Sequence, residues 1–197
     1  MIPAAVIATS HGALSRDELR ADQLRLALWM FLATVTMLFA AFTSAYVVRR
    51  SGADWAQLAL PRLLWANTAI LAASSLVLEA AARSGRRGAW RRASSAAWCA
   101  VFFGFVFLTG QGVAWRQLVA AGVYVPTNPH SSFFYMLTGA HAAHVLAALV
   151  VLMWGAASTA RGADDPVRWS LRLELCRTFW HYLGFVWVFL FALVALY

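Results

Sequence analysis

The chain has 197 residues, of which 62% are hydrophobic and only 12% are charged. A soluble domain carries about 25% charged residues, so this composition indicates a membrane protein. The formal net charge of +8 could suit a nucleic-acid partner, but the arginines lie between apolar stretches and form no basic face of a soluble domain, so we expect no nucleic-acid binding.

Five stretches are long enough to cross a hydrocarbon layer of about 30 Å, which takes about 20 apolar residues in a helix. Each must be helical, because lipid offers no partner to an unpaired backbone amide. The sequence therefore predicts an all-α membrane protein, with an N-terminal segment over 1–25 and a bundle of five transmembrane helices over 26–197. The expected spans are 26–48, 63–82, 93–115, 132–157 and 178–197.

The arginines predict how the five spans are oriented. Three lie in the N-terminal segment, five in the second loop and four in the fourth, against three in the first loop and one in the third. Short loops rich in arginine stay on the cytoplasmic side of a membrane. We therefore expect a cytoplasmic N-terminus and a C-terminus on the outer side.

The second loop, "RSGRRGAWRR" over 83–92, carries five of the arginines and a tryptophan. The simpler interpretation is a topology signal with an interfacial anchor. The alternative is a binding site for the headgroups of anionic lipids. The candidate residues for that site are Arg83, Arg86, Arg87, Trp90, Arg91 and Arg92.

Few ionisable side chains lie within the predicted spans, and each is a candidate site because such groups are costly at membrane depth. Glu79 is the only acid in a span, and Arg83 follows it four residues later. This order favours an ion pair on one helix. A proton-carrying role or a subunit contact is the alternative for Glu79. Asn67 is uncharged and suits close packing between helices.

Three histidines lie within the predicted spans: His141, His144 and His181. Zinc normally takes at least three protein ligands, often including cysteine or carboxylate, and no acid lies at the depth of these rings. A haem held by two histidines needs rings at matching depths, whereas His144 and His181 differ in depth by about 8 Å at 1.5 Å per residue. We therefore expect these side chains to form hydrogen bonds between helices and to bind no metal.

Four segments carry recognisable motifs. The segment "SSFFYMLTGAHAAHVLAALV" over 131–150 has the paired histidines, and "FWHYLGFVWVFLF" over 179–191 has a Trp-His pair that includes Trp180. The segment "LWANTAILAASSLVLEAA" over 64–81 has an Asn-Thr pair and a Ser-Ser pair, and "LALWMFLATVTMLFAAFTSAYVVRR" covers 26–50. In this order they resemble the FF-x-x-TG-x-H-x-x-H-V helix, the last helix, the Asn-Thr and Ser-Ser helix, and the first helix of the short form of subunit III of haem–copper cytochrome c oxidases. The resemblance covers about 25–197 and implies the short, five-helix bacterial form.

The resemblance implies a non-catalytic, accessory subunit of an oxygen-reducing, proton-translocating terminal oxidase in a bacterial inner membrane, with the C-terminus in the periplasm. The implied partners are subunit I above all, subunit II and the other oxidase subunits. The chain would stabilise subunit I and support proton uptake. It would carry no cofactor of its own except bound phospholipid, because haem and copper belong to the partner subunits. The family's histidines are not metal ligands.

Two positions depart from the family pattern. Val35 stands where many members carry a glutamate, and Gly184 stands where many carry an aspartate shortly after the Trp-His motif. The chain therefore has fewer acids in its predicted spans than many members of the family, and this favours a structural role over proton handling.

Three other functions stay open from the sequence. The first is an accessory subunit of a bacterial nitric oxide reductase, which shares the fold. The second is a free-standing haem-binding electron carrier that uses His141 or His144 together with His181. Such a carrier predicts a visible absorption spectrum from the purified chain, whereas the accessory subunit predicts none. The third is a small transporter, which predicts repeated, broken helices.

Overall fold

The computed structural model describes residues 16–160 and 166–196. Five α-helices and no strand occur among these residues. The helices are α1 Arg16–Arg49, α2 Leu63–Arg86, α3 Trp90–Ala120, α4 Pro129–Ala160 and α5 Pro166–Leu196. All five are long and apolar enough to cross a membrane. The prediction of an all-α protein with five spans is confirmed.

The helices are longer than the predicted spans. The first span was expected from residue 26 and the last from residue 178, whereas α1 begins at Arg16 and α5 at Pro166. The hydrocarbon thickness limits the apolar stretch and not the helix, which can continue through the interface. Two helices, α4 and α5, begin at a proline, a residue favoured at the first helical position because its missing N–H would be unpaired there in any case.

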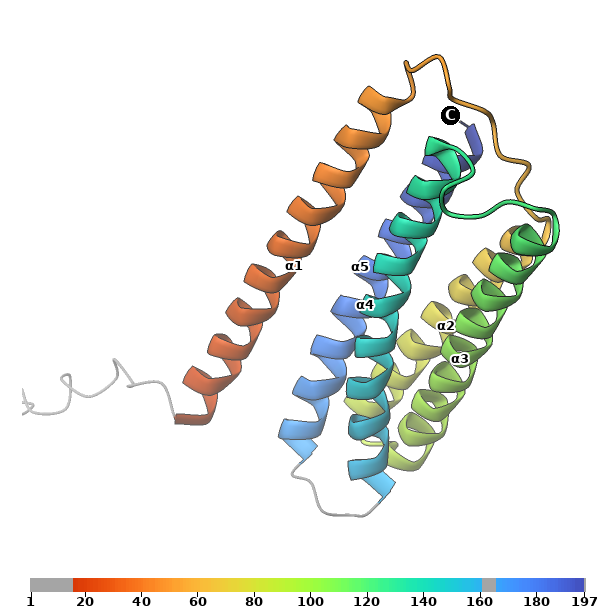
Figure 1. Cartoon of the computed structure of the whole chain (residues 1–197). Coiled ribbons are helices and arrows are strands. Elements are labelled where there is room, and N and C mark those ends of the chain that lie inside the picture. The colour runs from red at the N-terminus through yellow and green to blue at the C-terminus, as the bar shows by residue number, and fades with distance from the viewer. Residues whose placement is uncertain (1–15, 161–165, 197) are drawn as a thin grey trace, which may run out of the picture.

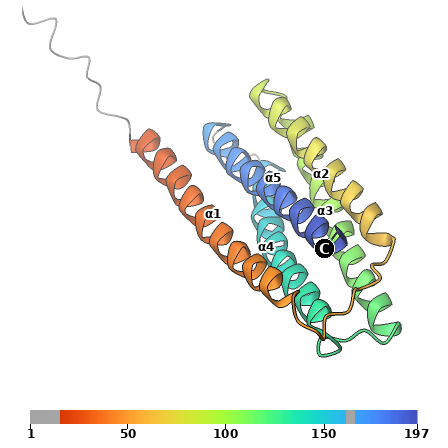
Figure 2. The same ribbon diagram turned by 90° about the horizontal axis from the view of Figure 1, so that it is seen from above.

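Helices α2 to α5 form a bundle, and α1 stands beside it next to α4 and α5 (Figures 1 and 2). The tight turn between α2 and α3 contains Gly88, whose φ of 72° suits glycine. This turn lies at one end of the bundle. The loops over 50–62 and 121–128 lie at the other end with the last turn of α5 (Figure 1). We call the latter the C-terminal end of the bundle.

Helix α1 contacts the bundle along a single narrow stripe. Two polar contacts support it: Thr36 Oγ1 lies 2.8 Å from Tyr182 Oη, and Arg25 Nη2 lies 3.2 Å from Glu174 Oε2. The remaining α1 surface is largely exposed in this chain. The side chains buried in the stripe recur every three, four or seven residues, as one face of a helix requires; they are Leu32, Val35, Phe39 and Tyr46.

At Gly104, helix α3 packs against side chains of both α4 and α5. A Cβ atom there would lie 2.6 Å from Leu149 Cδ2 and 2.7 Å from Trp180 Cη2. Small residues at such crossings let helix backbones approach in a membrane, where van der Waals packing replaces the hydrophobic effect as the source of association.

We expect Gly104→Ala to lower the free energy of unfolding by about 1–2 kcal/mol, because the added methyl group must displace Leu149 and the Trp180 ring. Gly112→Ala is the matched control on the same helix, since nothing lies within 4 Å of its added Cβ. That control should gain up to about 1 kcal/mol from helix propensity. Unfolding in mixed micelles, followed by circular dichroism, measures both; equal shifts would contradict the packing argument.

Candidate functional site

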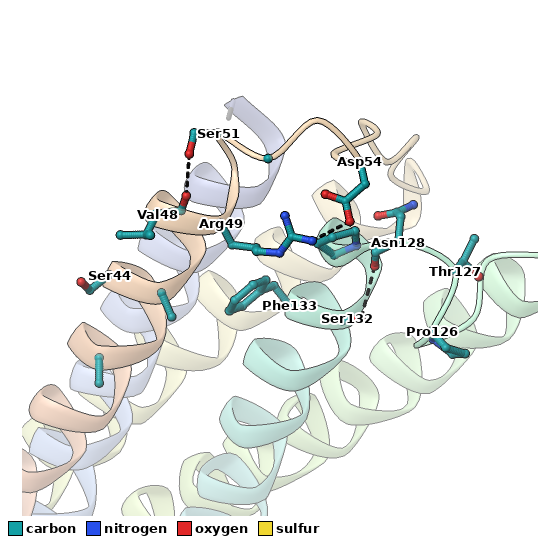
Figure 3. A pocket seen from close by; sticks show the side chains of 14 residues that line it. Ser44, Val48, Arg49, Ser51, Asp54, Pro126, Thr127, Asn128, Ser132 and Phe133 are labelled. Atoms are coloured by element: carbon teal, nitrogen blue, oxygen red, sulfur yellow. Dashed lines mark hydrogen bonds and ion pairs between the residues drawn. The ribbon is translucent and has the colours of Figure 1, made fainter.

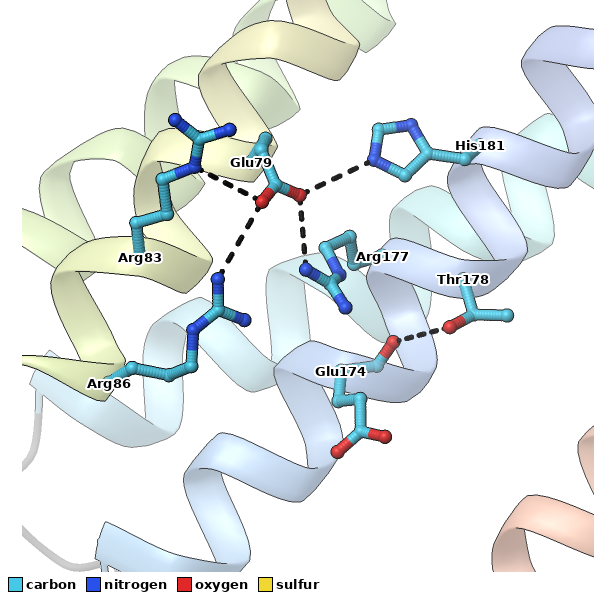
Figure 4. A network of polar contacts seen from close by, with 7 residues as sticks. All are labelled: Glu79, Arg83, Arg86, Glu174, Arg177, Thr178 and His181. Atoms are coloured by element: carbon cyan, nitrogen blue, oxygen red, sulfur yellow. Dashed lines mark hydrogen bonds and ion pairs between the residues drawn. The ribbon is translucent and has the colours of Figure 1, made fainter.

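Glu79 lies at the centre of a charged cluster between α2 and α5, at the end of the bundle opposite the C-terminal end (Figure 4). Its Oε1 atom is 3.3 Å from Arg83 Nε and 3.7 Å from Arg86 Nη2. Its Oε2 atom is 3.1 Å from Arg177 Nη1 and 3.8 Å from His181 Nε2. The ion pair with Arg83 that the spacing predicts is therefore present.

The Glu79 cluster joins two helices that are far apart in sequence. Both side chains of the cross-helix pair are largely shielded, with 25% of Glu79 and 24% of Arg177 exposed. Three guanidinium groups surround one carboxylate, so the cluster carries a surplus of positive charge. The partners Arg86 and Arg177 were not expected from the sequence. Arg86 is seven residues from Glu79, two turns along α2, but nothing local indicates which residue of α5 faces it.

The six candidates for a lipid-headgroup site lie at the end of the bundle opposite the C-terminal end, and all five arginines among them are exposed. Arg83 and Arg86 turn toward Glu79 (Figure 4). Trp90 is half-buried and packs edge-on against Trp169, with 5.3 Å between the ring centroids. The other three candidates are Arg87, Arg91 and Arg92, which have no described contact with Glu79.

Asn67 belongs to a polar layer in the middle of the bundle. Its side chain is buried, and Nδ2 donates to the Phe107 carbonyl at 3.0 Å and to Gln111 Oε1 at 3.4 Å. From α5, Trp187 Nε1 donates to Thr68 Oγ1 at 2.9 Å. The two bonds of Asn67 and the bond of Thr68 join α2 to α3 and to α5, as was expected of Asn67 as an interhelical polar residue.

His141 is fully buried in the same layer, but it makes no hydrogen bond between helices. Its ring lies 5.3 Å from the Trp187 ring and 6.0 Å from the Phe107 ring. Neither of its nitrogens has a hydrogen-bonding partner among the described residues. The expected polar bond is replaced by aromatic packing, because the neighbouring helices present rings at this level. Trp180 is similar: its buried indole N–H has no partner in the described part of the chain.

His144 also differs from the expected interhelical bond. Its Nδ1 donates to the carbonyl of Ala140, four residues earlier on the same helix, at 2.7 Å. The ring then faces α1, with centroids 5.8 Å from Phe39 and 6.3 Å from Phe31. The Ala140 carbonyl lies one turn back on the same helix, within reach of the His144 ring, so the local bond forms and the contact with α1 is aromatic. Of the three histidines, His181 makes the polar contact between helices, with Glu79.

A cavity of about 1230 Å³ opens at the C-terminal end of the bundle between the end of α1 and the start of α4 (Figure 3). Arg49 Nη2 donates to Asp54 Oδ2 at 2.5 Å beside it, and this hydrogen bond holds the pKa of Asp54 below its usual value of 3.8. A second cavity, of about 470 Å³, lies between α1 and α5 and is lined mainly by apolar side chains, Phe39 and Phe185 among them.

No group of three or more His, Cys, Asp or Glu side chains that could hold a metal occurs over 16–160 and 166–196.

The sequence model of the family described as "Cytochrome c oxidase subunit III" matches residues 6–197. The chain belongs to the cytochrome c oxidase subunit III family. A "Cytochrome c oxidase subunit 3" of Alkalihalophilus pseudofirmus is 28% identical to it over 204 aligned positions, which cover 98% of this chain and 97% of the relative. A "Cytochrome bo(3) ubiquinol oxidase subunit 3" of Pseudomonas aeruginosa is 32% identical over 85% of this chain and 82% of the relative.

A third relative, "Probable cytochrome c oxidase subunit 3" of Mycobacterium tuberculosis, is 27% identical over 64% of this chain, and the match spans only 62% of the mycobacterial protein. Five membrane-spanning helices and bacterial subunit III relatives make this chain a multi-pass protein of a bacterial inner membrane.

Val35 and Gly184 are the two positions at which an acid was expected from the family pattern. Val35 is buried in the α1 stripe, and Gly184 faces Ser75 of α2.

Proposed function

We propose that the chain is the accessory subunit III of a bacterial haem–copper terminal oxidase of the cytochrome c oxidase type. It binds chiefly to subunit I, with subunit II and other subunits in the same complex. It stabilises subunit I and supports oxygen reduction and proton uptake, while haem and copper lie in the partner subunits. The N-terminus is cytoplasmic and the C-terminus periplasmic. The family match over residues 6–197 carries this proposal.

The distribution of acids supports a structural role in the proposed complex. Glu79 is the only acid in the predicted spans, and it is held by Arg83, Arg86 and Arg177. Proton relays through a membrane use chains of ionisable side chains. Val35 and Gly184 leave this chain without two acids that many members of the family carry, so the support for proton uptake is indirect, through the integrity of subunit I.

The two cavities beside α1 support phospholipid as the bound ligand of the subunit. The cavity between α1 and α5 has apolar walls suited to an acyl chain. The exposed Arg87, Arg91 and Arg92 lie at the opposite end from the Arg49–Asp54 pair and suit anionic headgroups of the cytoplasmic leaflet.

A quinol oxidase is the second candidate for the complex. The P. aeruginosa relative, named as a subunit of a ubiquinol oxidase, is 32% identical to this chain over most of its length. The electron donor is then a quinol instead of cytochrome c.

Purification of a tagged chain in mild detergent tests the proposal. We expect a large subunit with the reduced-minus-oxidised spectrum of a haem–copper oxidase to co-purify, and the isolated chain to be colourless. Mass spectrometry of the large subunit separates an oxidase from a nitric oxide reductase. A haem band from the isolated chain would instead make it an electron carrier and overturn the proposal.

We expect His144→Ala to weaken the packing of α1 by about 1–2 kcal/mol, because the ring contacts to Phe31 and Phe39 are lost. The retention of the chain in the complex should fall, and the haem spectrum of the complex should not change. Leu146→Ala, at an exposed position of α4, is the matched control for both measurements. Loss of a haem band in His144→Ala would show that this histidine is a ligand.

A further inference from the structure

His130, the second residue of α4, links three segments at the C-terminal end of the bundle. Its side chain is only 2% exposed. The ring stacks on Trp55 of the first loop, with centroids 4.8 Å apart and planes 14° apart. Tyr46 of α1 packs edge-on against both rings, at 5.8 Å from His130 and 5.1 Å from Trp55. We call these residues, with the backbone of Leu58, the His130 cluster.

The hydrogen bonds of the His130 cluster assign the ring proton. The backbone N–H of Leu58 donates to Nδ1 at 3.1 Å, so this nitrogen carries no proton. In the neutral ring the proton is therefore on Nε2, which lies 3.3 Å from Tyr46 Oη and donates to it. Both nitrogens of the neutral ring are used, one toward the first loop and one toward α1.

The contacts of α1 show why this cluster matters for the helix. Tyr46 is fully buried at the far end of the α1 stripe. The two other cross-helix polar contacts described above, from Thr36 and Arg25, lie nearer the N-terminal end of α1. At the C-terminal end of the bundle, the loop from α1 to α2 is joined to α4 through the His130 ring.

We propose that the His130 cluster is an acid-sensitive switch, in which a second proton on the His130 ring breaks the Leu58 bond and releases the first loop from α4. The protonated Nδ1 is a donor that faces the Leu58 N–H, another donor, so an attractive contact becomes a repulsive one. Among the described residues, the charged or titratable groups that act on the ring are Tyr46 and Arg50. The first loop and α5 present only backbone groups to it, at Ala56 and Val194.

Burial of the ring and the positive charge of Arg50 both oppose the second proton, so the switch needs a more acid solution than an exposed histidine would. The neighbouring Asp54 does not respond in the same way. Its pKa lies below the usual 3.8 because Arg49 donates a hydrogen bond to it, so the Arg49–Asp54 ion pair remains charged at pH 4.5. A change in the first loop between pH 8 and pH 4.5 is therefore assigned to His130 and not to Asp54.

The physiological meaning of the switch rests on the proposed function and orientation. With the C-terminal end in the periplasm, His130 lies on the side to which a proton-translocating oxidase delivers protons. Acid accumulating there would loosen the first loop and the attached end of α1. The chemistry of the switch is independent of that assignment, because it can be measured on the chain itself.

Amide hydrogen exchange of the full chain in lipid nanodiscs, at pH 8 and pH 4.5, tests the switch. The Leu58 amide belongs to an irregular segment, and His130 Nδ1 is its hydrogen-bond acceptor. We expect peptides covering 50–62 to lose about tenfold in protection at pH 4.5, after correction for the intrinsic rate, since one hydrogen bond contributes about that factor. Unchanged protection between the two pH values would overturn the proposal.

Variants distinguish the switch from general acid unfolding. In His130→Asn the side-chain oxygen can accept from the Leu58 amide but does not titrate, so protection should be the same at both pH values. His130→Phe keeps the stack on Trp55 and removes both bonds, so protection should be low at both. His181→Asn is the control for a histidine elsewhere and should behave as wild type. A pH-dependent loss in His130→Asn equal to that of wild type would also overturn the proposal.

Discussion

Replacement of Trp187 by alanine is expected to lower the free energy of unfolding by about 3–5 kcal/mol, as is typical for a large aromatic side chain in a packed core. Trp187 is 1% exposed and lies where α2, α3, α4 and α5 meet. Its ring packs edge-on against Phe107 at 5.1 Å and lies 5.3 Å from His141. The substitution opens a cavity and also leaves the Thr68 hydroxyl without the indole donor.

Two further variants separate the packing of Trp187 from its hydrogen bond. Trp187→Phe keeps most of the ring and loses the bond to Thr68, so we expect a loss of about 1 kcal/mol. Trp29→Ala, at an exposed position of α1, should change stability by less than about 0.5 kcal/mol. Reversible unfolding in mixed micelles gives all three values. A loss in Trp187→Ala no larger than that in Trp29→Ala would contradict the assigned core.

Neutralisation of Glu79 is expected to give the second largest loss. In Glu79→Gln the carboxylate no longer balances the charges of Arg83, Arg86 and Arg177. Removing one partner of a buried ion pair costs about 3–5 kcal/mol. Because a quarter of the Glu79 side chain is exposed, water screens part of this, and we expect about 2–3 kcal/mol. The same unfolding measurement applies.

An exposed ion pair provides the control for Glu79. Glu174→Gln removes the contact with Arg25, in which nearly half of each side chain is exposed, and should cost less than about 1 kcal/mol. The double variant Glu79→Gln with Arg177→Met should recover part of the loss, since the uncompensated cation facing α2 is gone. Equal losses in Glu79→Gln and Glu174→Gln would show that the cluster is no more than surface charge.

The number and type of helices could be predicted because a membrane imposes them. An apolar stretch in lipid has to pair its own backbone amides, so the five helices can be predicted from hydropathy alone. Contacts within one helix were also predictable: Glu79 and Arg83 are four residues apart and form an ion pair. The ends of the helices could not be predicted. Helices α1 and α5 continue past their apolar stretches, where the thickness of the hydrocarbon layer no longer limits the helix.

The sequence pattern did not predict which side chains meet between helices. Periodicity indicates the face on which His141 and His144 lie but not which side chains meet that face. Both histidines meet aromatic rings, so the expected hydrogen bonds between helices are absent among the described residues. The role of His130 is not predicted for another reason: this residue precedes the fourth predicted span and falls in a predicted loop. The nearby Tyr46 and Trp55 give no signal in sequence that their rings enclose it.

The narrow stripe through which α1 touches the rest of the chain has a consequence for the order of folding. Helices α2 to α5 share an extensive interior, whereas α1 adds a single line of side chains. Regions with few buried contacts open at the lowest free energy. We expect α2 to α5 to form the first cooperative unit after membrane insertion, and α1 to dock on it last and to separate from it first.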